Sequence, residues 1–312
     1  MSALDTGVVS HGVTESRVGQ HGFPWGKALR HLLLIVFLAI VLIPVYVLLV
    51  TSFKTQTDAQ PAHAWLLPNE WTLENWKKAW NGPSAAVPGV GPAMIRTFQL
   101  VIPSTIISAF LGSMNGYVLS RWRFPHANAV FTFLLFGMFI PYQAVMVPLY
   151  RLVQWLKPVT SWVDALPTVP DGIPILILLH VVYGIPITTL IFRNYYESVP
   201  QELIEAARVD GAGMLRTYAS VVLPISVPSF VVVLIWQFTS AWNDFLFAKF
   251  FVANPDKSVV TIALNNLAGG SIMSDHGVEM AAALLASFPT LIIYVALGKY
   301  FLGGLMAGSV KG

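Results

Sequence analysis

The sequence has no cysteine. This absence excludes disulfide bonds, zinc–thiolate sites, iron–sulfur clusters and thiol catalysis, and it leaves the redox state of the compartment undecided. Charge is also scarce, because acidic and basic residues together form 11% of the 312 residues, against about 25% in a typical soluble domain. Fifteen acidic and eighteen basic side chains cannot coat one or two water-exposed domains. An ordinary soluble enzyme is therefore excluded.

Other functional signatures are missing too. The net charge of +3 is small and the basic residues are scattered, which excludes a role in nucleic-acid binding. No phosphate loop of the form G-x-x-x-x-G-K-[ST] occurs, since Gly298-Lys299 is followed by Tyr300. We therefore expect a chain that is not an enzyme and does not hydrolyse ATP itself. The seven histidines are dispersed, which argues against the alternative of a membrane enzyme.

The chain is instead rich in apolar sequence, with 55% hydrophobic residues and a mean hydropathy of +0.67. The hydrocarbon core of a bilayer is about 30 Å thick, so a spanning helix needs about 20 mostly apolar residues. Six stretches meet this requirement: Leu32–Val50, Phe98–Leu119, Ala127–Leu149, Ile173–Phe192, Ile225–Phe247 and Met280–Gly298. The sequence thus predicts an all-α integral membrane protein of six transmembrane helices, with both termini on one side.

The charges that flank the spans predict which side this is. Cytoplasmic connections are enriched in Lys and Arg, and the shortest connection, Arg121–His126, carries two arginines in six residues. We therefore expect both termini in the cytoplasm. Residues 1–28, rich in Gly, Ser, His and Thr, would be a flexible cytoplasmic tail. The membrane domain would then be 29–302, followed by a second cytoplasmic tail, 303–312.

The largest outward segment in this arrangement is 51–96, which holds four tryptophans and five prolines. Tryptophan favours the headgroup zone of a bilayer, so one interpretation is a loop that lies on the membrane surface. The other is a docking surface for an external partner, and the two are compatible. The tryptophans are Trp65, Trp71, Trp76 and Trp80.

The longest segment predicted on the cytoplasmic side is 193–224. Ser198 followed by Gln201 matches a capping box, and Pro200 suits a first helical turn, so a helix is expected to start here. Gly211 should end it, because glycine accepts the left-handed conformation at a helix stop. One face would carry small and apolar side chains at spacings of three and four: Leu203, Ala206 and Ala207. Such an elbow suits docking against a partner, and an ordinary linker is the alternative.

A family resemblance favours docking. Glu205-Ala206-Ala207, three residues, Gly211, nine residues and then Val221-Val222-Leu223-Pro224 resembles the EAA loop of ATP-binding-cassette (ABC) importer permeases. The tail, 299–312, is similar to the ending of the second permease subunit in carbohydrate importers of the maltose type. Further strings resemble the glucose/mannose branch of that family: Asn115-Gly116-Tyr117, His180-Val181-Val182-Tyr183-Gly184, Phe192-Arg193-Asn194-Tyr195-Tyr196, Ile235-Trp236-Gln237-Phe238 and Trp242-Asn243-Asp244-Phe245.

This resemblance implies a type I ABC importer permease in a bacterial cytoplasmic (inner) membrane. Its implied partners are a homologous permease subunit, two cytoplasmic ATPase subunits that bind Mg-ATP, an extracytoplasmic sugar-binding protein and membrane lipid; the chain itself would bind no cofactor and no metal. The loop would form a coupling helix in a cleft of an ATPase, through Glu205, Ala206, Ala207, Asp210, Gly211, Leu223 and Pro224. Gly308, Val310 and Lys311 of the tail would contact the ATPases as well.

Polar and aromatic residues inside the predicted spans are candidates for a sugar path, since a sugar needs hydrogen-bond partners and an aromatic face. They are Asn115, Gln143, Trp236, Gln237, Asn243 and Asp244, with His180 and Trp242 beside them. Asn115 lies between Gly112 and Gly116, a pattern that also indicates helix packing. His180 suits a hydrogen bond between helices better than a ligand. Asp244 would either cap a turn or meet the binding protein.

The resemblance leaves the substrate open. Glucose or mannose is predicted, with a disaccharide or a polyol as the alternative within the family. A stand-alone secondary carrier is a further alternative, but it should have inverted repeats or charged residues along its path, and the sequence displays neither.

Overall fold

The computed structural model describes residues 25–84, 87–122, 124–164, 172–252, 254, 257, 259–269 and 275–307. Within these ranges the regular secondary structure is helical, apart from an isolated antiparallel bridge between Ser84 and Val87. The predicted tail 1–28 lies outside the described residues except for its last four positions, which begin the first helix, α1 (Trp25–Thr51). The chain therefore enters regular structure earlier than the predicted start of the first span.

The chain divides into two compact units, Met1–Tyr46 and Val47–Gly312. The first contains most of α1, which covers the predicted span Leu32–Val50 and has Pro44 inside it. Its sequence is apolar around the full circumference from Leu32 onward, as expected of a helix that lies in lipid.

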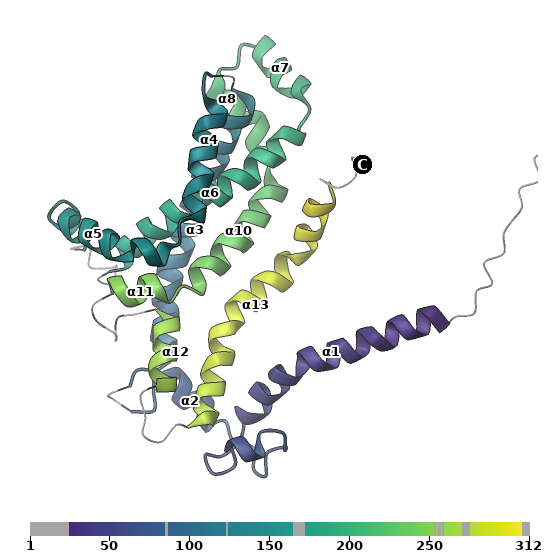
Figure 1. The fold of residues 1–312 in the computed structure, drawn as a ribbon, viewed down its shortest axis with the longest axis vertical. Helices are drawn as coiled ribbons and strands as arrows, with labels where there is room; N and C mark the ends of the chain where they lie inside the picture. The colour runs from purple at the N-terminus through teal and green to yellow at the C-terminus, as the bar shows by residue number, and fades with distance from the viewer. Residues whose placement is uncertain are drawn as a thin grey trace, which may run out of the picture. The chain divides into compact units, whose positions relative to one another are not determined.

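The second unit is built on two long helices, α3 (Val90–Arg121) and α6 (Ile173–Ser198), which pack along each other (Figure 1). Helix α10 (Val227–Trp242) packs against both, and α13 (His276–Ala307) packs against α10 and α3. Two shorter helices, α2 (Glu74–Asn81) and α12 (Val260–Gly269), contact α3 and α13. The buried core between these helices includes Leu100, Val101, Leu176, Leu179, Trp242, Ala281 and Ala282.

Small residues bring α3 and α6 close together. A Cβ atom added at Gly112 would lie 2.2 Å from Thr188 Oγ1, and one added at Gly116 would lie 2.8 Å from Phe192 Cβ. The predicted packing role of the pattern Gly112-x-x-x-Gly116 is therefore confirmed, because only glycine permits this approach.

Among the described residues, four helices are long and apolar enough to cross a membrane: Trp25–Thr51, Val90–Arg121, Ile173–Ser198 and His276–Tyr300. Two bent pairs raise the number to six if each pair is one span. The all-α membrane fold is thus confirmed, and the third and fifth of the six predicted spans are each bent within the described residues.

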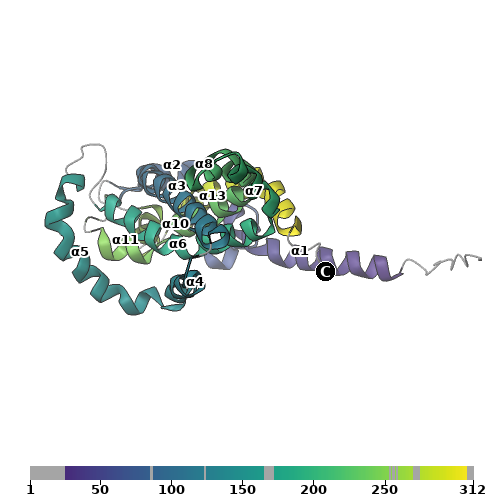
Figure 2. The same cartoon turned by 90° about the horizontal axis from the view of Figure 1, so that it is seen from above.

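The predicted span Ala127–Leu149 bends by 99° between 127–139 and 142–156. Pro141 explains the break, because proline lacks the N–H that a continuous helix needs, and it forces the preceding residue out of the helical region. Ile140 is extended accordingly, with φ −76° and ψ 117°. The two arms are α4 (Ala127–Phe136) with a 3₁₀ turn, and α5 (Tyr142–Asp164). Seen from above, they follow an arc around α6 and α11 (Figure 2).

The predicted span Ile225–Phe247 is interrupted at both ends. Its helix, α10, begins only after Ser226, where the axis turns by 78° from the preceding segment Met214–Ile225. It stops at Trp242, and a separate short helix, α11 (Leu246–Phe251), follows. The apolar run is continuous in the sequence, but the helix that it forms is interrupted.

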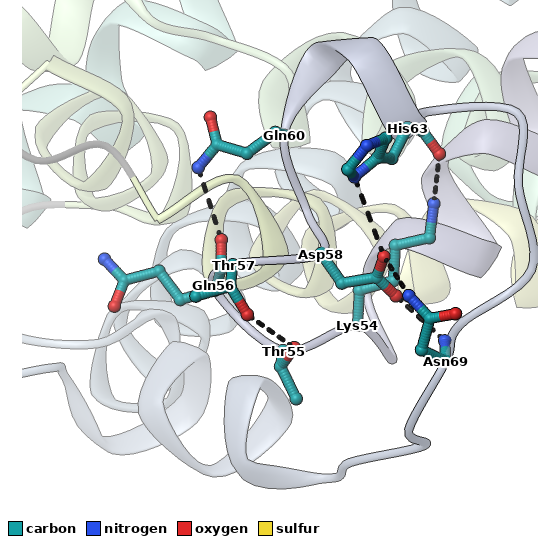
Figure 3. Close-up of polar contacts among 8 residues, drawn as sticks. All are labelled: Lys54, Thr55, Gln56, Thr57, Asp58, Gln60, His63 and Asn69. Carbon is teal, nitrogen blue, oxygen red and sulfur yellow. Dashed lines mark hydrogen bonds and ion pairs between the residues drawn. The ribbon is translucent and has the colours of Figure 1, made fainter.

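Within the predicted outer segment 51–96, α3 already begins at Val90, and the part before it folds around its own buried charges (Figure 3). Lys54 is fully buried, and its Nζ donates a hydrogen bond to the carbonyl oxygen of His63 at a distance of 2.7 Å. The carboxylate of Asp58 accepts from both the backbone N–H and the side-chain Nδ2 of Asn69, each over 2.9 Å. These contacts cross-link the loop.

Three of the four loop tryptophans, Trp65, Trp71 and Trp80, are exposed. Exposed tryptophans are compatible both with contact at the membrane surface and with docking of an external partner. Both interpretations of this loop therefore stay predictions.

Candidate functional site

Helix α7 (Gln201–Val209) forms the expected elbow, but it does not start as predicted. The capping box is absent, because α6 continues through Ser198 and the serine Oγ donates to the Tyr195 carbonyl of its own helix over 2.7 Å. Pro200 is the N-cap residue, outside the first turn. Gln201 Nε2 donates to Glu205 Oε1 over 3.1 Å instead of reaching back to residue 198.

The end of α7 confirms the prediction for Gly211, which has φ +78°. Its N–H donates to the Arg208 carbonyl over 3.0 Å, and the Ala212 N–H donates to the Ala207 carbonyl over 2.9 Å. This pair of bonds, with Asp210 as the C-cap, is a Schellman motif, which satisfies carbonyls at the helix end.

Two of the three residues of the predicted docking face of α7 are exposed, and the third is buried within the chain. Ile204 and Ala207 are buried, whereas Leu203 and Ala206 are exposed. The reason is tertiary, since Ile204 packs into an apolar cluster with Tyr117, Tyr196 and Tyr218. The opposite surface of α7 is left exposed, and it carries Glu205, Ala206, Val209, Asp210 and Gly211.

Two arginines tie α7 and the end of α6 to α3. The Arg121 guanidinium at the end of α3 donates to the carbonyl oxygens of Tyr196 and Val199. A cation is favoured at the carbonyls of a helix C-terminus. Arg208 of α7 donates to the Arg121 carbonyl over 3.4 Å, and its guanidinium lies 4.9 Å from the centre of the Trp122 ring. From the sequence, Arg121 was expected only to mark the cytoplasmic side of the membrane, and its bonds to the Tyr196 and Val199 carbonyls were not predicted.

Leu223 and Pro224 lie in an irregular passage between α7 and α10. After α8 (Met214–Thr217) comes a π-helical turn, Tyr218–Val222, in which the Leu223 N–H bonds the Tyr218 carbonyl. Pro224 brings no N–H to the next turn, which accounts for the local departure from α-helical bonding. Pro224 itself is exposed and lies within the short α9 (Leu223–Ile225), and the turn into α10 is at Ser226.

The candidate path residues do not form a single group. Gln237 is buried on α10, and its Nε2 donates to the His180 carbonyl of α6 over 2.9 Å. Gly184 makes room for this amide, since a Cβ there would lie 2.5 Å from Gln237 Nε2. Its neighbour Trp236 is 54% exposed, so the two adjacent side chains face different surroundings, as expected.

Asp244 caps a turn, one of its two predicted roles. Its carboxylate accepts from the backbone N–H groups of Phe247 and Ala248 at the start of α11, over 3.2 and 3.1 Å. Asp244 Oδ2 also lies 3.4 Å from His180 Nε2, so His180 bridges α6 to the break after α10. His180, Gln237 and Asp244 therefore form one polar cluster between helices.

The other candidates lie apart from this cluster. Asn115 is half-buried on α3, whereas Gln143 and Asn243 are exposed, and Asn243 Nδ2 donates to the Thr239 carbonyl of its own helix. In the described part of the chain, no three His, Asp or Glu side chains gather as metal ligands. Gly308, Val310 and Lys311 of the tail lie outside the described residues.

Comparison with known proteins assigns this arrangement to a family. The family described as "Binding-protein-dependent transport system inner membrane component" matches residues 104–305, from the middle of α3 to the end of α13. The chain belongs to this family. The matched region of this inner membrane component includes α7, its Schellman stop and the π-helical turn.

Relatives of this inner membrane component occur in bacteria and archaea. It is 33% identical to the xylose/arabinose import permease protein XacI of Haloferax volcanii, over 89% of this chain and 92% of the relative. It is 34% identical to the melibiose/raffinose/stachyose import permease protein MelC of Bacillus subtilis, over 86% of this chain and 91% of the relative. It is 30% identical to the glucose import system permease protein GlcU of Saccharolobus solfataricus, over 92% and 96%.

The fold of the inner membrane component occurs in a solved transporter. A chain of a bacterial ABC transporter that imports the acidic polysaccharide alginate superposes with a TM-score of 0.70 and 19% identity, over 89% of this chain and 96% of that one. The likeness confirms the ABC permease fold.

Proposed function

We propose that the chain is a permease subunit of an ABC importer for a carbohydrate, and that it forms half of the translocation pathway. XacI, MelC and GlcU, named as sugar import permeases, support a carbohydrate substrate. We further propose a monosaccharide such as glucose or mannose. The partners would be a sister permease, two ATPase subunits and an extracytoplasmic sugar-binding protein, in a bacterial inner membrane with both termini in the cytoplasm.

The exposed surface of α7 carries this proposal. The contacts of Ile204 and Arg208 hold one side of α7 against the rest of the chain, and Gly211 ends the helix. The helix can therefore move as one body. Glu205 and Ala206 stand on its free side. A stiff helix with an acidic and small-residue surface suits a partner cleft that supplies a cation, here the cleft of an ATPase subunit that carries Mg-ATP.

The first prediction concerns Glu205. Glu205→Lys reverses the charge that faces the ATPase, and we expect it to abolish sugar uptake while the subunit remains inserted. The measurement is uptake and sugar-stimulated ATP hydrolysis in proteoliposomes that hold the complete transporter. Glu202→Lys is the matched control, since Glu202 is exposed on the same helix but lies outside the Glu205-Ala206-Ala207 motif. Normal sugar-stimulated hydrolysis and uptake in Glu205→Lys contradict the coupling role.

The same proteoliposomes identify the substrate. Glucose, mannose, xylose and melibiose are supplied in turn with the cognate binding protein, and stimulated hydrolysis by glucose or mannose is the expected result. Stimulation by melibiose alone would favour the disaccharide alternative. Uptake by the purified chain without ATPase would overturn the importer function and favour a secondary carrier.

A further inference from the structure

Four buried hydroxyl groups meet where α3, α6 and the passage to α10 come together. Ser113 Oγ of α3 lies 2.6 Å from Tyr196 OH of α6 and 2.8 Å from Tyr218 OH of the π-helical turn. Ser226 Oγ, at the bend before α10, donates to Tyr196 OH over 3.0 Å. Ser113, Tyr196 and Ser226 are at most 1% exposed, and Tyr218 is 8% exposed. We call these four residues the hydroxyl cluster.

The hydroxyl cluster brackets α7 in the sequence. Tyr196 precedes the helix and Tyr218 follows its glycine stop, so the segment 197–217 lies between them. Both tyrosine hydroxyls bind the same atom, Ser113 Oγ. The two flanks of α7 are thereby attached to the same residue of α3. The segment 197–217 is therefore anchored at its start and at its end.

Packing around the hydroxyl cluster reinforces this closure. The ring of Tyr117 on α3 lies 5.4 Å from that of Tyr218, and its hydroxyl donates to the Met214 carbonyl over 3.4 Å. Ile204 of α7 packs in the same apolar cluster as Tyr117, Tyr196 and Tyr218. Side chains of α7 and of both its flanks therefore meet the same face of α3.

The hydroxyl cluster also holds the two irregular points in the chain between α7 and α10. Tyr218 is the first residue of the π-helical turn, and Ser226 is the residue at the 78° bend. A π-helical turn is rare and occurs mostly at functional positions. Ser226 Oγ additionally bonds the Val222 carbonyl at the end of that turn. Without these bonds the passage would be the most deformable part of the route from α7 to α10.

We propose that Ser113, Tyr196, Tyr218 and Ser226 are positioning residues for energy coupling. They fix both flanks of α7 to α3, so that a displacement of α7 moves α3 and α6 and is not absorbed at the π-helical turn. This proposal rests on the coupling role proposed above for α7.

The test is the amount of sugar imported per ATP hydrolysed, in proteoliposomes with the complete transporter and whichever of glucose, mannose, xylose or melibiose is imported. Ser113→Ala and Tyr218→Phe each remove one hydroxyl of the cluster. We expect the ratio to fall by about two- to thirtyfold, the range in which substitutions between two sites alter their coupling, while hydrolysis continues. Ser113→Thr retains a hydroxyl and should restore the ratio.

Thr189→Val is the matched control. Thr189 is a fully buried residue of α6 whose hydroxyl has no hydrogen-bond partner in the described part of the chain. An unchanged ratio in the control and a lowered ratio in the cluster variants supports the proposal. An equal fall in the control, or an unchanged ratio in Ser113→Ala and Tyr218→Phe, overturns it.

A second measurement tests the proposal if a cluster variant assembles poorly with the other subunits. Amide hydrogen exchange of residues 197–217 is followed in the purified complex that carries Ser226→Ala, which removes the cluster hydroxyl at the bend before α10. Faster exchange than in the unmodified complex supports the proposal, and unchanged exchange overturns it. The two proposals fail separately: if Glu205→Lys uncouples the transporter and the cluster variants do not, only the role of the hydroxyl cluster is refuted.

Discussion

Gly211 illustrates how one backbone angle closes a helix. Its φ of +78° is a conformation that side chains with a Cβ rarely adopt, yet a Cβ there would meet nothing within 4 Å. The cost of replacing it is therefore conformational and not steric, about 1–2 kcal/mol for most residues. Asparagine tolerates this region better, because its short polar side chain can bond locally.

The second prediction concerns this residue. Gly211→Pro forces φ to about −65° and removes the N–H that bonds the Arg208 carbonyl, so the Schellman motif at the end of α7 is lost. We expect loss of sugar uptake with normal membrane insertion, measured in the reconstituted complex. Gly211→Asn is the control and should retain most of the uptake. Equal uptake by the two variants would show that the helix stop is irrelevant to transport.

Single residues also mark where sequence reasoning succeeded and where it did not. Gly211 was predictable because its role depends on its own backbone. Ser198 was not, because it matches a capping box but lies in the last turn of α6, whose length is set by packing on α3. Asp244 could be reduced to two roles from sequence, and only the structure places the Phe247 N–H against its carboxylate.

At the scale of elements, the pair α3 and α6 depends on close approach. A Cβ at Gly112 would lie 2.2 Å from Thr188 Oγ1 and 2.5 Å from Thr188 Cβ, distances that real Cβ atoms do not adopt. The neighbouring helix must then shift, and overpacking of this kind costs about 1–3 kcal/mol.

The third prediction follows from this contact. Gly112→Ala should lower the midpoint of thermal unfolding of the purified complex, because α3 and α6 are forced apart. The control is Gly137→Ala, since a Cβ at Gly137 has nothing within 4 Å. A midpoint for Gly112→Ala equal to that of the control would refute the close packing.

The elements themselves were mostly predictable, since runs of apolar residues specify where helices lie. Their bends were not. Pro141 is one of several prolines in the predicted spans, and Pro103 and Pro186 lie inside α3 and α6, which continue as single helices through them. A proline produces a sharp bend only where neighbouring helices do not keep the segments before and after it in line. Whether they do so depends on tertiary packing. The buried side of α7 likewise depends on tertiary packing, because Ile204 packs against tyrosines that are distant in the sequence.

At the scale of the whole molecule, the proposed importer joins this chain to its ATPases at α7 and at the C-terminal tail. The fourth prediction is that deletion of 308–312 weakens sugar-stimulated hydrolysis more than it reduces membrane insertion, since insertion depends on the apolar spans. Both quantities are measured on the same preparation, and deletion of an equal length within 1–24 serves as the control. Full stimulation after the tail deletion would remove the tail from the ATPase contact.

The length of α3 has a consequence for signalling across the bilayer. Thirty-two residues make a helix about 48 Å long, whereas the hydrocarbon layer is about 30 Å thick. Near one end, Thr97 Oγ1 accepts a hydrogen bond from the Val260 N–H of α12, and at the other, Arg121 donates to the Tyr196 and Val199 carbonyl oxygens at the end of α6. One uninterrupted helix is therefore longer than the hydrocarbon layer is thick. In the proposed importer, α3 would connect the side that receives the loaded sugar-binding protein to the side of the ATPase subunits without an intervening hinge.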